Sequence, residues 1–448
     1  MSPDSASPPA TDPGIPTGWR WAPWWVLAYV AFWPASRVSE AILSIGALTT
    51  IYLLARARFR DGTRLLGNAA WALTTALFFA YWLPQLFSTF DALDPAAAVG
   101  KVMAGLRYLP FLWLVAISVA TLDGRRKVFS GIALIMAAWS LDLLLQGAAG
   151  WRHSALNGGL DALYQLVRDG KAMCDGQADR GADRFNGIFG TCNPVLGVVL
   201  ASFSPFLLHA AHKRLGVRGW LAAALLAGIA VVLAGSRASL LTYALVLLLS
   251  GWHVLGWKRL AGVFVAGAVA IAVLGSLHAP LGERIVRSTQ LLAANGAGVD
   301  SALSGRGRIW QGAACMIREH PVNGVGVRDF RNAWPACDPD PGVMPAWGQG
   351  PALHAHQLVL EVLSETGLLG LLLWIAGLAL AWRAWRWSTA DARDRARPAL
   401  QALLVTVFPL NTHLAFHSAF WGGVFLLLLA LYAGSLLARG TSPVASED

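Results

Sequence analysis

Four ionisable residues stand where a long apolar segment begins, in LHAHQLVLEVLSETGLLG at 353–370. They are His354, His356, Glu361 and Glu365. Ionisable side chains at the edge of a membrane helix are costly unless they are paired or used in function. A histidine titrates near neutral pH, so His356 could act as the general base that accepts a proton from an attacking hydroxyl group. His354 would not share a helical face with His356, and the two make a poor metal pair.

The same residues also have a purely structural interpretation. His356 could cap the helix or lie at the membrane interface without any role in chemistry. Glu365 follows His356 by nine residues, or about two and a half helical turns, so the spacing does not imply direct contact between them. His413 and His417, near the outer end of the last two apolar segments, are weaker candidates.

Basic residues recur on the side of the expected membrane that normally lacks them. Arg237 lies in LAGSRASL, a tight turn between two apolar runs, and Arg306 lies in SGRGRIW. A guanidinium group offers two parallel donors that match phosphate oxygens, so these cations indicate a pyrophosphate site. For each residue alone, a solvated or lipid-headgroup contact is the alternative. The full set of donor-binding candidates is Arg237, Arg306, Arg184, Lys101 and Arg107, with Glu365, His354 and Arg308 as supporting residues.

The composition is that of a membrane protein. Of the 448 residues, 56% are hydrophobic and 13% are charged, and the mean hydropathy is +0.52. Soluble proteins carry about 25% charged residues, so an ordinary soluble fold is excluded. A spanning helix needs roughly 20 mostly apolar residues. We expect twelve, at about 22–36, 38–56, 65–89, 96–120, 127–147, 187–211, 219–235, 238–256, 259–278, 356–382, 398–415 and 417–438.

Lysine and arginine concentrate in alternate short loops, at 56–64, 125–127, 213–218, 258–259 and 383–397. The positive-inside rule places these loops and both termini in the cytoplasm. The net charge of +10 is therefore an orientation signal and does not indicate nucleic-acid binding. The predicted fold class is an all-α polytopic membrane protein with a single transmembrane domain at 22–438. Residues 1–21 would form a disordered cytoplasmic tail without a cleaved signal peptide, and 439–448 a second tail.

Two long connections, at about 148–186 and 279–355, are expected on the outer side, the second partly helical. Its stretch RIWQGAACMIREH has apolar residues near one helical face. No metal site is favoured: no cysteine pair has CxxC spacing, and DPD at 338–340 is better explained as a proline-rich turn. The outer side permits a disulfide, for example between Cys174 and Cys337, but the sequence does not fix the pairing of Cys174, Cys192, Cys315 and Cys337.

Three stretches, in order, resemble motifs of the O-antigen ligase and O-antigen polymerase superfamily. They are GSRASL, SGRGRIWQGAACMIREHPVNGVGVRDF and HQLVLEVLSETGLLG. RFNGIFGTCNPVLG also resembles the family's segment before its central helices. The resemblance covers about 184–370, whereas the first 150 residues match only in hydropathy. The last motif aligns on His356, Leu360, Glu365, Gly367 and Gly370, with Gln357 in place of the usual Asn.

The resemblance implies a GT-C-type membrane glycosyltransferase. The absence of a carboxylate–metal motif fits a reaction that needs no metal or other cofactor. Its donor would be O-antigen on undecaprenyl pyrophosphate and its acceptor lipid A–core, at the periplasmic face of a Gram-negative inner membrane. It implies that Arg237 and Arg306 bind the pyrophosphate and that His356 is the essential histidine; His354 has no family counterpart.

Other functions remain open. A polymerase of the same superfamily would join repeat units on the lipid carrier, and a further relative transfers the chain to proteins. A lipid-linked glycan transporter would bind the same anion without needing a general base.

Overall fold

The computed structural model describes residues 17–60, 65–149, 154–167, 170, 172–173, 185–190, 195–277, 306–345, 347, 350–409, 411 and 415–438. Across these residues the chain is helical and contains no strand, which confirms the all-α prediction. Most of the two predicted tails lies outside them. The helices are η1 (Thr17–Trp19), α1 (Ala22–Ala31), α2 (Ser36–Phe59), α3 (Asn68–Ser88), η2 (Thr89–Asp91), α4 (Pro95–Gly105), α5 (Tyr108–Val119), α6 (Leu122–Ala149), α7 (Ala155–Val167), η3 (Gly187–Phe189), α8 (Leu196–Leu233), α9 (Arg237–Leu277), α12 (Arg306–Glu319), α13 (Phe330–Cys337), α14 (Leu358–Arg386), α15 (Ala390–Thr406) and α16 (Ala419–Leu436).

Helix α16 is the central helix of the bundle. Every residue from Trp421 to Leu436 is buried, as expected for a helix that is apolar on all sides. It packs against α3, α5 and α15. Helix α2, in contrast, exposes Ile45, Leu48 and Ile51. A helix with all backbone groups bonded internally and an apolar outer face is suited to contact with lipid.

The number of membrane crossings differs from the expected twelve. Within the described ranges, seven helical stretches are long and apolar enough to cross a membrane, judged by length and composition. Two of them, α8 and α9, each unite two expected segments, although the backbone leaves the helical region at Gly216 and Gly256. The halves of α8 fold back on each other, since a Cβ on Gly197 would lie 2.6 Å from that of Ala234. Helix α1 has only 10 residues and does not qualify.

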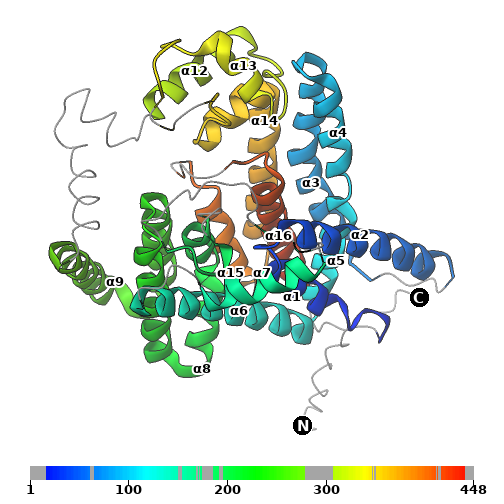
Figure 1. The fold of residues 1–448 in the computed structure, drawn as a ribbon. Helices are drawn as coiled ribbons and strands as arrows, with labels where there is room; N and C mark the ends of the chain where they lie inside the picture. Colours follow the sequence, from blue (N-terminus) through cyan, green and yellow to red (C-terminus); the bar gives the residue numbers. More distant parts are fainter. Residues whose placement is uncertain are drawn as a thin grey trace.

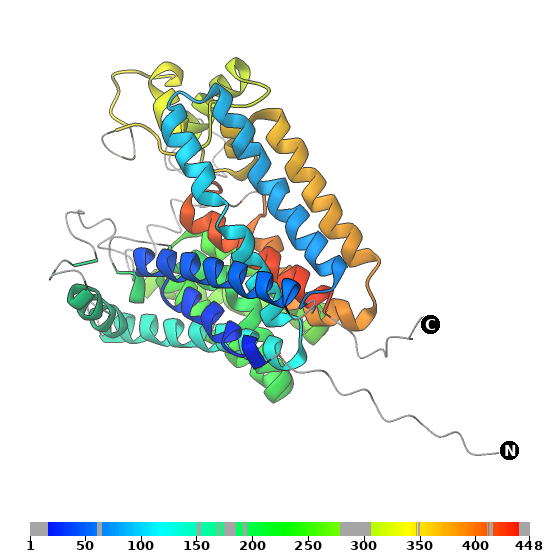
Figure 2. The same cartoon turned by 90° about the vertical axis from the view of Figure 1, so that its right-hand side faces the viewer.

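Helices α12 and α13 form a second packing unit outside this bundle. Ile309, Ala313 and Met316 from α12 share an apolar cluster with Phe330 and Trp334 from α13. In Figures 1 and 2 the two helices lie at the upper end of α14, which runs beside α3. The amphipathic stretch in the long outer connection is therefore a helix, and it covers one end of the bundle.

A disulfide bond between Cys315 and Cys337 closes this unit, with the two Cα atoms 5.6 Å apart. The pairing of Cys174 with Cys337 suggested above is therefore wrong. The packing of α12 on α13 brings Cys337 to Cys315, a neighbour that sequence spacing alone does not identify. Cys174 and Cys192 lie outside the described residues.

Candidate functional site

The sequence predicted a helix that starts at residue 356. In the structure, His356 instead lies just before helix α14. The helix begins at Leu358, and Gln357 is its N-cap. The Oε1 atom of Gln357 accepts a hydrogen bond from the Leu360 N–H at 2.6 Å, and its Nε2 donates to the Pro409 carbonyl at 3.0 Å. The glutamine that departs from the family pattern thus caps the helix and fixes the position next to His356.

The backbone of His356 is in the left-handed region, with φ of 53°. This conformation is uncommon outside glycine, costs about 1–3 kcal/mol, and is concentrated at functional sites. The rings of His354 and His356 lie with their centroids 3.9 Å apart. The two rings can lie together because this segment precedes the helix and is not itself helical. The positive end of the α14 dipole begins beside them and favours a bound anion.

Helix α14 is broken at Gly367, where φ is 64° and ψ is −165°, and a loop from α12 fills the break. The Leu368 N–H donates to the Pro321 carbonyl at 2.9 Å. A Cβ on Gly367 would lie 2.1 Å from the Val322 oxygen, and a Cβ on Gly324 would lie 2.4 Å from the Glu365 carbonyl carbon in the same turn of α14. Both positions therefore require glycine. The HPVNGVG loop at 320–326 and the ETG stretch at 365–367 therefore pack directly against each other. We call this contact the joint.

A buried group of two carboxylates and one histidine lies behind this joint. Nδ1 of His417 lies 3.0 Å from Oε2 of Glu365, and the two side chains are 2% and 0% exposed. Glu361 accepts a hydrogen bond from the His417 backbone N–H at 3.1 Å. Glu365 also accepts one from the Arg328 N–H at 2.9 Å. Glu365 thus pairs with His417, the weaker candidate of the sequence, and ties α14 to the segment before α16. His413 lies outside the described residues.

Two groups within the described part of the chain have ligand atoms close enough to share a metal ion. In one, atoms of Glu361, Glu365 and His417 lie within 4.8 Å of one another. These atoms also make the hydrogen bonds just described. The other group contains Cys315 and Cys337, whose sulfurs form the disulfide.

Arg328 joins this site although the sequence reasoning did not select it. Its backbone is also left-handed, with φ of 68°. Burial, and then the charge of Arg328, lower the pKa of Arg331. Cations held this close repel one another, so an anion among them would be stabilised. The signal that could have identified Arg328 is its position two residues after Gly326, in the Gly-Val-Gly-Val-Arg stretch of the loop.

Lys101 and Arg107 line a common cavity of about 220 Å³ between α3, α4 and α16. Arg107 forms an ion pair with Glu40 and donates to the Ser44 hydroxyl at 2.9 Å, so its charge is partly neutralised. Lys101 therefore carries more of the free positive charge of this cavity. Tyr81, Gln85, Tyr108 and Ser418 also line it.

Arg237 and Arg306 are the first residues of α9 and α12. The helix dipole favours an anion near such ends. Arg184 lies outside the described residues.

Arg308 is engaged within the α12–α13 unit. Its Nε and Nη2 donate to the two carboxylate oxygens of Asp338 at 2.7 and 2.6 Å, and Nη2 also donates to the Asp340 carbonyl. The Asp340 N–H donates back to Asp338 at 3.2 Å, which closes the DPD turn. Arg308 therefore supports the fold of this unit.

The apolar helices define a helical membrane protein, and His356 lies at the start of its helix α14. Residues 222–375 match the family model described as O-Antigen ligase, a stretch that includes Arg237, Arg306, His356 and Glu365. This part of the chain is therefore similar to the O-antigen ligase family. A search of curated proteins finds no match.

Proposed function

We propose that the chain is an O-antigen ligase, a metal-independent, inverting glycosyltransferase of the GT-C type. It transfers O-antigen polysaccharide from undecaprenyl pyrophosphate to lipid A–core and so completes lipopolysaccharide. It resides in the inner membrane of a Gram-negative bacterium, with both termini in the cytoplasm and the site in the periplasm. In this arrangement the two halves of α8 and of α9 cross the membrane separately.

The disulfide supports this orientation. Bonds of this kind persist in oxidising compartments such as the periplasm. The Cys315–Cys337 bond lies in the α12–α13 unit, which sits at the His356 end of α14. The arginine-rich connection after α14 lies at the opposite end of that helix, where the positive-inside rule expects the cytoplasm.

The observation that carries the proposal is the strained backbone of His356 at the positive end of α14. In the proposed reaction, His356 accepts the proton of an acceptor hydroxyl as that oxygen attacks the anomeric carbon of the donor sugar. The bond from this carbon to the pyrophosphate oxygen breaks, and undecaprenyl pyrophosphate leaves with the electron pair. One displacement inverts the carbon.

Charge grows on the leaving phosphate in the transition state, and fixed cations stabilise it. We assign this role to Arg237 and Arg306, with Lys101 on the cavity side. The buried pair of Glu365 and His417 positions the start of α14 and does not touch the substrate in this scheme. The choice of ligase over polymerase rests on the large basic outer connection and the tight turn at Arg237.

The test uses the purified chain with EDTA, an undecaprenyl-pyrophosphate-linked glycan and lipid A–core, followed by gel. Glycan on lipid A–core supports the ligase. Longer lipid-linked chains without that product would assign the chain to the polymerases. No new product, under conditions where an established ligase works, would point to a transporter or a protein acceptor.

A further inference from the structure

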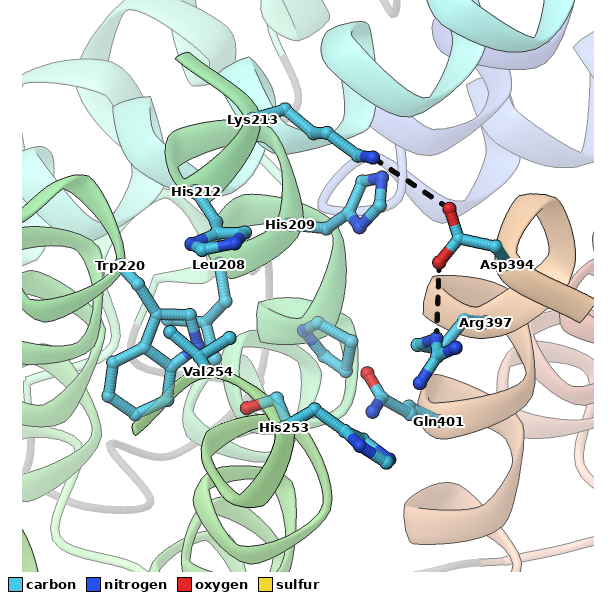
Figure 3. Close-up of a pocket in the computed structure, with 12 residues that line it drawn as sticks. Leu208, His209, His212, Lys213, Trp220, His253, Val254, Asp394, Arg397 and Gln401 are labelled. Carbon is cyan, nitrogen blue, oxygen red and sulfur yellow. Dashed lines mark ion pairs between the residues drawn. The ribbon is translucent and has the colours of Figure 1, made fainter. Parts of the chain in front are cut away.

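A second pocket, of about 290 Å³, lies between α8, α9 and α15, far along the bundle from His356. Helix α14 runs away from His356, and α15 begins where α14 has ended, so the first turns of α15 lie at the opposite end. Figure 3 shows the charged and aromatic side chains that converge there. Those with ionisable groups are His209, His212, Lys213, His253, Asp394 and Arg397.

The pocket has an excess of positive charge. The Asp394 carboxylate lies 3.7 Å from Nζ of Lys213 and 3.5 Å from Nε of Arg397. One carboxylate neutralises one of these two cations, so the pocket keeps a net positive charge even with its histidines neutral. Neither ion pair is close enough to be a good hydrogen bond, which leaves donors on both cations for another acceptor.

Three buried nitrogen atoms in the pocket wall make no hydrogen bond to any described residue. They are Nε1 of Trp220, Nδ1 of His212 and Nε of Arg397, the last of which has only its 3.5 Å ion pair with Asp394. Trp220 is only 1% exposed, so bulk water does not accept a hydrogen bond from its indole N–H. An unpartnered buried donor costs about 1–3 kcal/mol in proteins. A ligand with several acceptor oxygens would satisfy these groups together.

The surroundings indicate that this ligand is part of a lipid. Leu208 and Val254 provide apolar wall beside the charged groups. Trp252 and Trp257 are 56% and 62% exposed and flank the break of α9 at Gly256. Exposed tryptophans of this kind mark the level of the lipid headgroups. The pocket therefore opens at headgroup depth.

We propose that this pocket binds the phosphate of an anionic phospholipid headgroup, with Lys213 and Arg397 as its principal contacts. Basic pockets between membrane helices recognise such headgroups by the same chemistry. The proposal does not depend on the reaction assigned to the opposite end of the molecule.

The test is native mass spectrometry of the full chain in detergent, titrated with phosphatidylglycerol, phosphatidylcholine or inorganic phosphate. The test variant combines Lys213→Gln with Arg397→Gln. The control combines Arg214→Gln with Arg218→Gln, which removes the same charge from exposed positions outside the pocket. We expect phosphatidylglycerol to bind the test variant about 30-fold more weakly than the wild type, and the control to bind nearly as the wild type does.

Three outcomes would overturn the proposal. Equal losses in the test and control variants would indicate diffuse surface charge. Equal binding of phosphatidylcholine and phosphatidylglycerol would show that the pocket does not select an anionic headgroup. Saturable binding of inorganic phosphate without retained lipid would assign the pocket to a soluble phosphate. If the double variant does not fold, His253→Glu adds a carboxylate at an exposed edge of the pocket and should weaken phosphatidylglycerol binding in the same assay.

Discussion

The imidazole of His417 and the carboxylate of Glu365 form a fully buried contact, with Nδ1 and Oε2 3.0 Å apart. The two residues are 52 positions apart in the sequence, one in α14 and one just before α16. The contact links the central helix of the bundle to the helix that carries His356 at its start. It is therefore a means by which packing in the core positions the candidate base.

Removing Glu365 should destabilise the protein. Glu365→Ala leaves the Arg328 N–H and His417 without their acceptor, and the loss of one partner from a buried pair costs roughly 3–5 kcal/mol. Glu365→Gln keeps a hydrogen-bond acceptor and should lower the free energy of unfolding much less. Thermal unfolding in detergent measures both, with Glu319→Ala, an exposed carboxylate, as the control. If Glu365→Ala and Glu319→Ala unfold at the same temperature, the contact does not stabilise the fold.

Replacing His356 should abolish glycan transfer but leave binding of the lipid-linked donor intact. A general base contributes roughly 100- to 10,000-fold, so His356→Ala should lower the transfer rate by that factor. Binding of the lipid-linked donor should change little, because the cations that hold it are unchanged. The matched control is His320→Ala, a half-buried histidine at the end of the α12 segment. A well-expressed, fully active His356→Ala variant would exclude His356 as the base.

Gly367→Ala should break the joint between α14 and the loop. The new Cβ would lie 2.1 Å from the Val322 oxygen, in a backbone conformation that disfavours alanine. Strain and displacement together should cost more than about 2 kcal/mol and lower the transfer rate as well. Gly262→Ala is the control, because a Cβ there meets nothing within 4 Å. Equal unfolding temperatures for the two variants would show that the loop does not pack against the break.

Loss of the disulfide should loosen the α12–α13 unit more than the bundle. The bond joins residues 22 positions apart, and closing a loop of this size is worth roughly 3 kcal/mol. Replacing Cys315 and Cys337 together by Ala should raise hydrogen exchange in α12 and α13. Exchange in α16 should stay unchanged and provides the internal reference. Unchanged exchange in both regions would contradict the prediction.

The stability of this unit should fall in acid. Hydrogen bonds from Arg308 hold the pKa of Asp338 below its usual value. A carboxyl group with a depressed folded pKa contributes stability that is complete above its unfolded pKa of about 3.9 and is lost as the pH falls through the folded value. Unfolding temperatures measured from pH 6 down to 3 should therefore fall less steeply for Asp338→Asn than for the wild type. Parallel curves would exclude this ion pair as a source of the acid sensitivity.

The sequence predicted helix positions well because apolar runs and basic loops are local signals. It located the breaks near Gly216 and Gly256 for the same reason, since basic residues cluster there. It did not identify the partners of Glu365 or Cys337, which lie 52 and 22 positions away and meet only through packing. The sequence did not identify Arg328, because the position of this residue depends on a left-handed backbone that an arginine does not predict.

The break in α14 also fixes the length of the continuous helix that follows it. From Leu368 to Arg386 the helix has 19 residues, a length of about 28 Å. The hydrocarbon layer of a bilayer is about 30 Å thick. The continuous part of α14 is thus long enough to span that layer. With α14 oriented as proposed above, His356 would lie just outside the acyl chains, and the proposed transfer should then depend on acyl-chain length.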